Sequence, residues 1–198
     1  MQLYPDNIIH VYNRGNNKQT LFFSDANYVF FIEKIRKYII TKADVLAYCL
    51  MPNHFHLLLY TTETSVAPKK IGSLMSTELN NAVRILLSSY TAAINKEKGF
   101  TGSLFQQNTK YKLLTGEATN KTNVPLTCFH YIHQNPVRAN LVYRMEDWKY
   151  SSFNEYMSST MNNICNKERA LEFLDINNEN FYESSYGVLK DEYVRGIF

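Results

Sequence analysis

The chain of 198 residues has few cysteines and no long apolar run, and both absences narrow the kinds of protein it can be. Its three cysteines lie far apart and form no CxxC pair, so neither a disulfide framework nor a thiolate zinc site is indicated. No apolar run approaches the roughly 20 residues that span a bilayer. The first residues, MQLYPDNIIHVYNRG, lack the basic and apolar regions of a signal peptide. We therefore expect a soluble protein of a reducing compartment, the cytoplasm, without a membrane partner.

Charge is distributed unevenly, although the formal net charge is only +3. Residues 1–149 contain 17 Lys and Arg against 10 Asp and Glu, a balance of +7, whereas residues 150–198 contain 4 against 8, a balance of −4. A basic body with an acidic tail suits a polyanionic partner for the body. Ordinary scatter of surface charge is the alternative.

Apolar patterning over the first two thirds of the chain predicts an α+β fold. Strands are predicted at residues 8–14, 45–50, 54–60 and 109–114, and helices at residues 25–39 and 69–98. The second and third strands are joined by a turn with the sequence MPN, in which proline cannot donate a ladder hydrogen bond. The resulting order is βαββαβ, the ferredoxin-like arrangement with an antiparallel sheet and its helices on one face.

The remainder of the chain adds a further helix and an extension. Pro125 suits the first residue of a helix that carries Leu126, Phe129 and Ile132 inward. Beyond residue 156 the chain becomes rich in asparagine and acidic residues, and short helices are predicted around 168–174 and 186–195. We therefore divide the chain into a domain of residues 1–156 and an acidic C-terminal extension of residues 157–198.

Two histidines lie two residues apart in the segment CLMPNHFHLLLY. Successive strand side chains point to opposite faces, so His54 and His56 share one face while Phe55 points to the other. Two imidazoles side by side on a strand make half of a metal site. A polar sheet surface is the alternative that the spacing leaves open.

A second pair of polar residues follows in the segment FHYIHQNPVRANLV. Tyr131 and Asn135 are four residues apart, so they lie on one face of a helix. Asn135 precedes Pro136, which disfavours helical geometry, and we expect it in the last turn of the helix. A packing tyrosine and a turn-forming asparagine are the alternative roles.

The two pairs together predict a phosphoryl-transfer site. Two imidazole nitrogens and one amide oxygen leave coordination positions open on a divalent ion such as Mg²⁺ or Mn²⁺. Such an ion polarises a phosphoryl oxygen and neutralises developing charge, while the tyrosine beside it acts as a nucleophile. Attack on a phosphodiester would form a phosphotyrosine bond and conserve energy for rejoining.

Five sequence segments occur in an order that carries a family resemblance. They are YNRGNNKQTLF, LAYCLMPNHFHLLL, GSLFQ followed by YK, YIHQNPVRANLV and EDWKYSSFNEY. Together they resemble the single-tyrosine HUH transposases of the IS200-like superfamily, specifically the REP-associated tyrosine transposases. The resemblance covers residues 8–156.

This resemblance implies a ferredoxin-like palm that cleaves and rejoins single-stranded DNA, with a hairpin-forming repeat as its target. Carried over by position, His54, His56 and Asn135 would hold one Mg²⁺ or Mn²⁺, and Tyr131 would be the catalytic nucleophile. The intermediate would be a 5′-phosphotyrosine with a free 3′-hydroxyl. Similar proteins act as dimers with shared sites or as monomers, which leaves the oligomeric state undecided.

Several side chains in or near these segments are candidates for DNA contact. The basic candidates are Arg14, Lys110, Lys112 and Arg138. Tyr12 and Phe105 are candidates for stacking on unpaired bases, with core packing as the alternative. Asn108 and Thr109 stand where the family usually has a basic residue, which would weaken a phosphate contact.

Three other functions stay open on the sequence. A non-catalytic protein that binds RNA or single-stranded DNA on the same four-stranded platform would need no metal. A metal-dependent hydrolase with water as the nucleophile would leave no protein–DNA adduct. Histidines that merely line the sheet would bind no metal at all.

Overall fold

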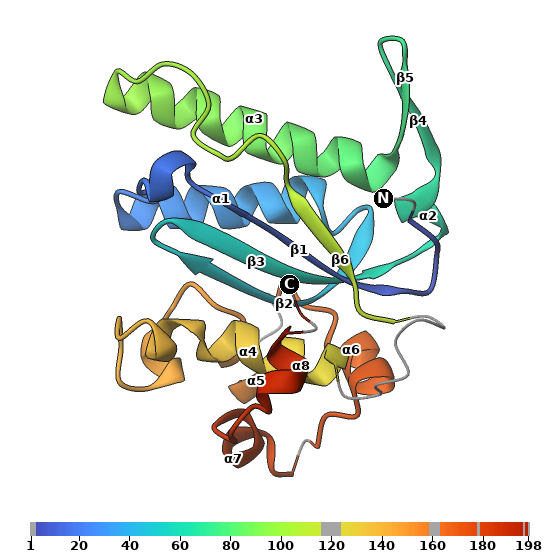
Figure 1. Ribbon diagram of the computed structural model, residues 1–198, viewed down its shortest axis with the longest axis vertical. Coiled ribbons are helices and arrows are strands. Elements are labelled where there is room, and N and C mark those ends of the chain that lie inside the picture. The colour runs from blue at the N-terminus through green and yellow to red at the C-terminus, as the bar shows by residue number, and fades with distance from the viewer. Residues whose placement is uncertain (1–2, 116–123, 159–162, 178, 196, 198) are drawn as a thin grey trace.

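The computed structural model describes residues 3–115, 124–158, 163–177, 179–195 and 197. Four strands form an antiparallel sheet in the order β2-β3-β1-β6. They are β1 (Ile8–Arg14), β2 (Ala43–Met51), β3 (His54–Thr61) and β6 (Lys110–Leu113). Helices α1 (Asp25–Tyr38) and α3 (Glu78–Lys98) cover one face of this sheet (Figure 1). The predicted ferredoxin-like palm is thereby confirmed.

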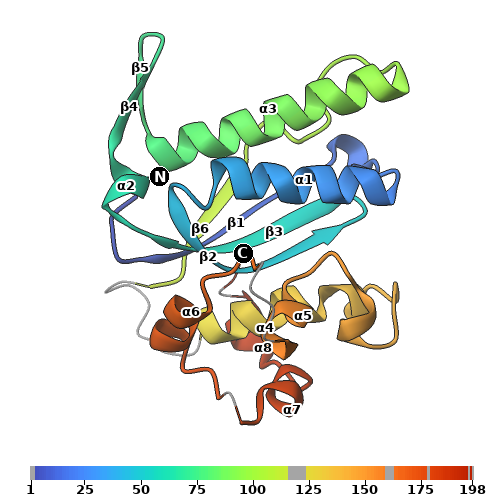
Figure 2. The same cartoon turned by 180° about the vertical axis from the view of Figure 1, so that it is seen from behind.

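The other face of the sheet is covered by the later part of the chain (Figure 2). Helix α4 (Val124–Arg138) packs against β2 and β3. The shorter helices on this side are α5 (Phe153–Met157), α6 (Lys167–Leu174), α7 (Phe181–Ser185) and α8 (Asp191–Arg195). Two 3-10 turns, η1 (Asn16–Lys18) and η2 (Met145–Asp147), lie in the connections. The sheet is therefore a middle layer between two layers of helices.

The single helix predicted over residues 69–98 is wrong in its first part. That part belongs to a hairpin of β4 (Pro68–Ile71) and β5 (Leu74–Thr77), which follows a one-turn helix, α2 (Glu63–Val66). Only the part from residue 78 onward is helical, as α3. The hairpin projects from the palm beside the start of α3 (Figure 1).

Local chemistry explains this hairpin. Gly72 in its turn has a φ of 59°, in the left-handed region that glycine adopts without steric cost. Thr77 is the N-cap of α3, and its hydroxyl accepts a hydrogen bond from the amide of Asn80. Leu74 and Met75, which suggested a helical stripe, are 72% and 68% exposed. Their spacing matched a helix, but the turn and the cap determine the structure.

The C-terminal extension differs in part from its prediction. The helix predicted around 168–174 is present as α6, and its N-cap Asn166 accepts a hydrogen bond from the amide of Arg169. The helix predicted over 186–195 is wrong in its first part and confirmed in its last, because α7 ends at Ser185 and α8 covers residues 191–195. Gly187 lies just after α7, where its amide closes a turn on the carbonyl of Ser184.

The extension packs on the palm through apolar side chains. Phe181 of α7 and Leu174 of α6 are buried in the same cluster as Phe129 of α4. Ile197 is fully buried in this cluster as well. The division of the chain at residue 156 stays a prediction.

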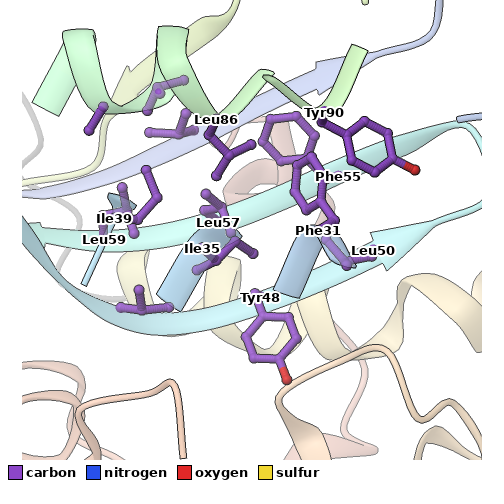
Figure 3. Packing of buried hydrophobic residues seen from close by; sticks show 14 of the residues in the cluster. Phe31, Ile35, Ile39, Tyr48, Leu50, Phe55, Leu57, Leu59, Leu86 and Tyr90 are labelled. Atoms are coloured by element: carbon purple, nitrogen blue, oxygen red, sulfur yellow. The ribbon is translucent and has the colours of Figure 1, made fainter. Parts of the chain in front are cut away.

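Alternation along β3 divides its side chains between two apolar cores. On the face covered by α1 and α3, Phe55 and Leu57 pack with Phe31 and Tyr90 (Figure 3). On the opposite face, Leu58 belongs to the cluster that also includes residues of α4. Each residue of β3 therefore has a fixed side of the sheet, which sets where its histidines point.

Two features expected from the composition concern the apolarity of the helices and the state of the cysteines. Among the described residues no helix is both long enough and apolar enough to cross a membrane. Cys49, Cys128 and Cys165 are free thiols, and each is buried.

Replacing Phe31 by alanine should strongly destabilise the fold, because its fully buried ring packs against Phe55 and Tyr90. Removing such a ring costs about 3–5 kcal/mol of unfolding free energy. The adjacent Phe30, 39% exposed on the same helix, is the matched control, and its alanine variant should lose much less. Urea unfolding measures both, and equal losses would contradict this packing.

Candidate functional site

A pocket of about 360 Å³ lies between one end of the β1–β3 pair and α4. Its lining residues are Tyr12, Asn13, Arg14, His54, His56, Gln106, Asn108, Lys110 and Tyr131. Three of the four residues predicted to form the site, His54, His56 and Tyr131, thus line one pocket within a single chain.

The pairing of β1 with β3 positions the strand side of this pocket. Tyr12 stands opposite His56 and Arg14 opposite His54 in the antiparallel register. The two imidazole rings are nearly perpendicular, with centroids 4.9 Å apart, while Phe55 between them is in the core on the other face. His54 and His56 thus share one face of the sheet and Phe55 lies on the other, as predicted.

Each of these histidines has a hydrogen-bond partner at its Nδ1 atom. His54 Nδ1 lies 2.7 Å from Oδ1 of Asn53 in the turn, which accepts its proton. His56 Nδ1 lies 2.8 Å from Nε2 of His10 on β1. Any metal bound by these rings would therefore be held by their Nε2 atoms. A fixed partner on the other ring nitrogen is typical of metal-ligating histidines.

Burial keeps both imidazoles neutral near pH 7. The pKa of His54 is lowered to about 4 by burial and then by the nearby Arg14 guanidinium. The pKa of His56 is lowered well below its ordinary value by burial, with smaller effects from His10 and His54. Neutral imidazole is the form that can coordinate a metal.

Tyr131 approaches the histidines from α4. Its ring centroid is 6.0 Å from that of His56, at a nearly perpendicular angle. The guanidinium carbon of Arg138 lies 5.7 Å from the Tyr131 ring centroid. Burial raises the pKa of the phenol, and the positive charge of Arg138 opposes that rise. The phenol is therefore protonated at neutral pH and needs activation before it can attack.

Asn135 lies in the last turn of α4, as expected. It is buried, and its Nδ2 donates a hydrogen bond of 2.8 Å to the carbonyl of Tyr131. It is not among the described residues that line the pocket. Its predicted role as a metal ligand stays a prediction.

The donor set fits a divalent ion in part. Within the described residues, no group of three or more His, Cys, Asp and Glu side chains is placed to hold a metal. His54 and His56 would supply two neutral nitrogens, and the remaining positions would take amide, water or phosphate oxygens. Two protein ligands with open positions suit an ion that also contacts a substrate.

The candidate DNA-contacting residues separate into two groups. Arg14 and Lys110 line the pocket, and Tyr12 and Asn108 line it as well. Arg14 Nε is buried and has no hydrogen-bond partner among the described residues. A buried donor of this kind needs a partner, and an anion bound in the pocket would supply one.

The other candidates lie elsewhere. Lys112 pairs with His10 in the sheet and is not among the described residues that line the pocket. Arg138 is not among the described residues that line the pocket, but its guanidinium lies over the ring of Tyr131, which does line it. Phe105 is buried in the core on the far face, which is the alternative considered for it. Thr109 accepts a hydrogen bond from Asn13 Nδ2.

Sequence reasoning missed His10, which bonds directly to His56. The signal was present, because His10 alternates along β1 with Tyr12 and so faces the same side of the sheet. The pattern within a single strand does not indicate which strand pairs with the one that carries His56.

Comparison with known proteins supports the fold. No protein-family model and no curated protein matches the chain. The solved structure of a REP-associated tyrosine transposase bound to a REP hairpin matches with a TM-score of 0.56 and 15% sequence identity. The match covers 83% of this chain and 90% of that chain. The chain therefore shares the fold of that transposase, and the resemblance drawn from the sequence is confirmed at this level.

Acid should destabilise the protein through its buried histidines. Burial lowers the pKa of His130, next to Tyr131, to about 4, whereas the unfolded chain keeps the ordinary value of 6.5. Protons therefore bind the unfolded chain first, and stability falls as the pH drops from 6.5 towards 4. His130 alone should contribute about 2 kcal/mol to the loss between about pH 7 and pH 5. Urea unfolding of His130→Gln should show a shallower decline, and a slope equal to wild type would contradict this effect.

Proposed function

We propose that the protein is a metal-dependent endonuclease and strand transferase for single-stranded DNA, of the REP-associated transposase type. The observation that supports this function best is the meeting of Tyr131 with two neutral imidazoles, those of His54 and His56, in one pocket. The shared fold with a transposase solved on a REP hairpin supports a hairpin-forming DNA repeat as the target.

In the proposed reaction, the Tyr131 phenol oxygen attacks the scissile phosphorus. A bond forms between phosphorus and the tyrosine oxygen while the bond to the 3′ oxygen breaks, and the phenol proton is lost to solvent as the departing 3′ oxygen gains one. The product is a 5′-phosphotyrosine and a free 3′-hydroxyl, which can attack later to rejoin strands. A bound Mg²⁺ or Mn²⁺ would polarise the phosphoryl oxygen and neutralise developing charge.

Other side chains of the pocket would place the DNA. Arg14 and Lys110 carry positive charge at the pocket wall and suit the phosphates on either side of the scissile bond. Tyr12 presents an aromatic ring in the same wall, suited to stacking on an unpaired base. His54, His56 and Tyr131 come from one chain, which supports a site completed without a second subunit. The three buried cysteines of the protein are free thiols, which is consistent with a protein that acts in the reducing cytoplasm.

A non-catalytic binder of single-stranded nucleic acid is the second candidate. It is favoured by the position of Asn135, which is not among the described residues that line the pocket, so that His54 and His56 supply the protein nitrogens there and this residue supplies no third ligand. Such a protein would hold hairpin DNA equally well with and without Mn²⁺, and His54→Ala would leave its affinity unchanged.

Tyr131→Phe should abolish the covalent adduct between the protein and a labelled hairpin oligonucleotide in Mn²⁺, because the variant lacks the attacking oxygen. Folding should be preserved, since only one hydroxyl is removed. The matched control is Tyr143→Phe, at a tyrosine that is 97% exposed. Denaturing gel electrophoresis detects the adduct and the cleaved strand. Retention of both by Tyr131→Phe would refute the assignment of the nucleophile.

Arg14→Gln should weaken binding of hairpin DNA, because a positively charged group at the pocket wall, with its Nε buried, would lose its contact with phosphate. Loss of one phosphate contact should lower the slope of log affinity against log salt by about 1. Lys37→Gln, on helix α1 across the sheet, is the control and should bind as wild type does. Fluorescence anisotropy over a salt series gives both slopes, and identical slopes would exclude Arg14 from the interface.

A further inference from the structure

His10 is a fully buried polar residue of β1 that contacts one of the two candidate metal ligands, His56. Its Nε2 lies 2.8 Å from Nδ1 of His56, and its Nδ1 lies 3.1 Å from the backbone carbonyl oxygen of Ile197. The rings of His10 and His56 stack, with centroids 5.0 Å apart and planes 24° apart. Three groups from distant parts of the chain therefore form one hydrogen-bonded row.

The chemistry of this row allows one arrangement of protons. A carbonyl oxygen can only accept, so the contact with Ile197 requires the proton of His10 on Nδ1. Full burial opposes a second proton on the same ring, so His10 Nε2 carries a lone pair. His56 must then donate from its Nδ1, which leaves the lone pair of His56 on Nε2.

The opposite arrangement is unfavourable. If His10 Nε2 donated to His56, the neutral His10 ring would turn an Nδ1 lone pair towards the lone pairs of the Ile197 oxygen. That contact would be repulsive, and it would leave a buried carbonyl without this donor. The backbone of Ile197 therefore determines the proton position on His56, through His10.

We propose that His10 is a positioning residue for metal binding, which holds His56, a residue of the pocket lining, in the tautomer with its lone pair on Nε2. This proposal rests on the proposed function, since it assigns a purpose to that lone pair. Asn53 does the same for His54, by accepting from its Nδ1 at 2.7 Å. The two ligands are thus oriented by different means, one by an adjacent turn and the other by a relay that reaches Ile197.

The tautomer can be measured without metal, DNA or activity. Nitrogen-15 NMR of histidine-labelled, metal-free protein should show His56 protonated at Nδ1 and unprotonated at Nε2. In His10→Phe, which keeps the bulk of the ring but offers no acceptor, the proton of His56 should move towards Nε2. A wild-type His56 protonated at Nε2 would overturn the proposal, and this result needs no variant to fold.

Metal affinity gives a second readout. Titration calorimetry with Mn²⁺ should show binding roughly 10–100-fold weaker for His10→Phe, the usual cost of losing a group that orients a metal-bound histidine. His10→Gln can accept from His56 and donate to the carbonyl of Ile197, so it should retain most of the affinity. His130→Phe carries the same substitution at a buried histidine of α4 and should bind as wild type does. Unchanged affinity in His10→Phe would overturn the proposal.

Different results would refute the proposed function and the proposed role of His10. A wild-type protein with the expected tautomer, but with neither Mn²⁺ binding nor a covalent adduct, would overturn the metal-dependent function and the purpose assigned to His10 with it. Normal adduct formation together with the reverse tautomer would overturn the role of His10 alone.

Discussion

The antiparallel register between β1 and β3 is the constraint on which the rest of the structure depends. It places Tyr12 opposite His56 and Arg14 opposite His54. A shift of one residue would turn every side chain of a strand to the other face, so burial of Phe55 in one core also directs both histidines to the opposite side. The apolar packing that stabilises the palm is thus the same packing that holds the two imidazoles together.

Much of the fold and half of the site follow from periodicity. Alternation along a strand was enough to place His54 and His56 on one face. The order of elements along the chain, βαββαβ, was enough to indicate the palm, whose sheet has the strand order β2-β3-β1-β6. The hairpin before α3 was not predicted, because Leu74 and Met75 match the apolar spacing of the helix that follows. Gly72 and the cap at Thr77 carried the contrary signal, and here local turn chemistry prevails over apolar spacing.

The parts that the sequence could not predict depend on contacts between distant segments. Nothing in the neighbourhood of His10 in sequence shows that a carbonyl 187 positions away will meet its ring. Asn135 has the spacing of a ligand, yet it is not among the described residues that line the pocket, and its amide nitrogen donates to the carbonyl of Tyr131. Spacing along one helix identifies a shared face, but whether a side chain on that face reaches the pocket depends on how the helix packs against the sheet.

The proposed dependence of His56 on Ile197 links the candidate site to a residue that follows all strands of the palm in the sequence. The four strands of the palm are all present once Leu113 has been made, and α4 with Tyr131 once Arg138 has been made. His54, His56 and Tyr131 all precede, by many residues, the carbonyl that would orient His56 under this proposal. The tautomer of His56 would then be set only once the segment around α8 has packed on the sheet.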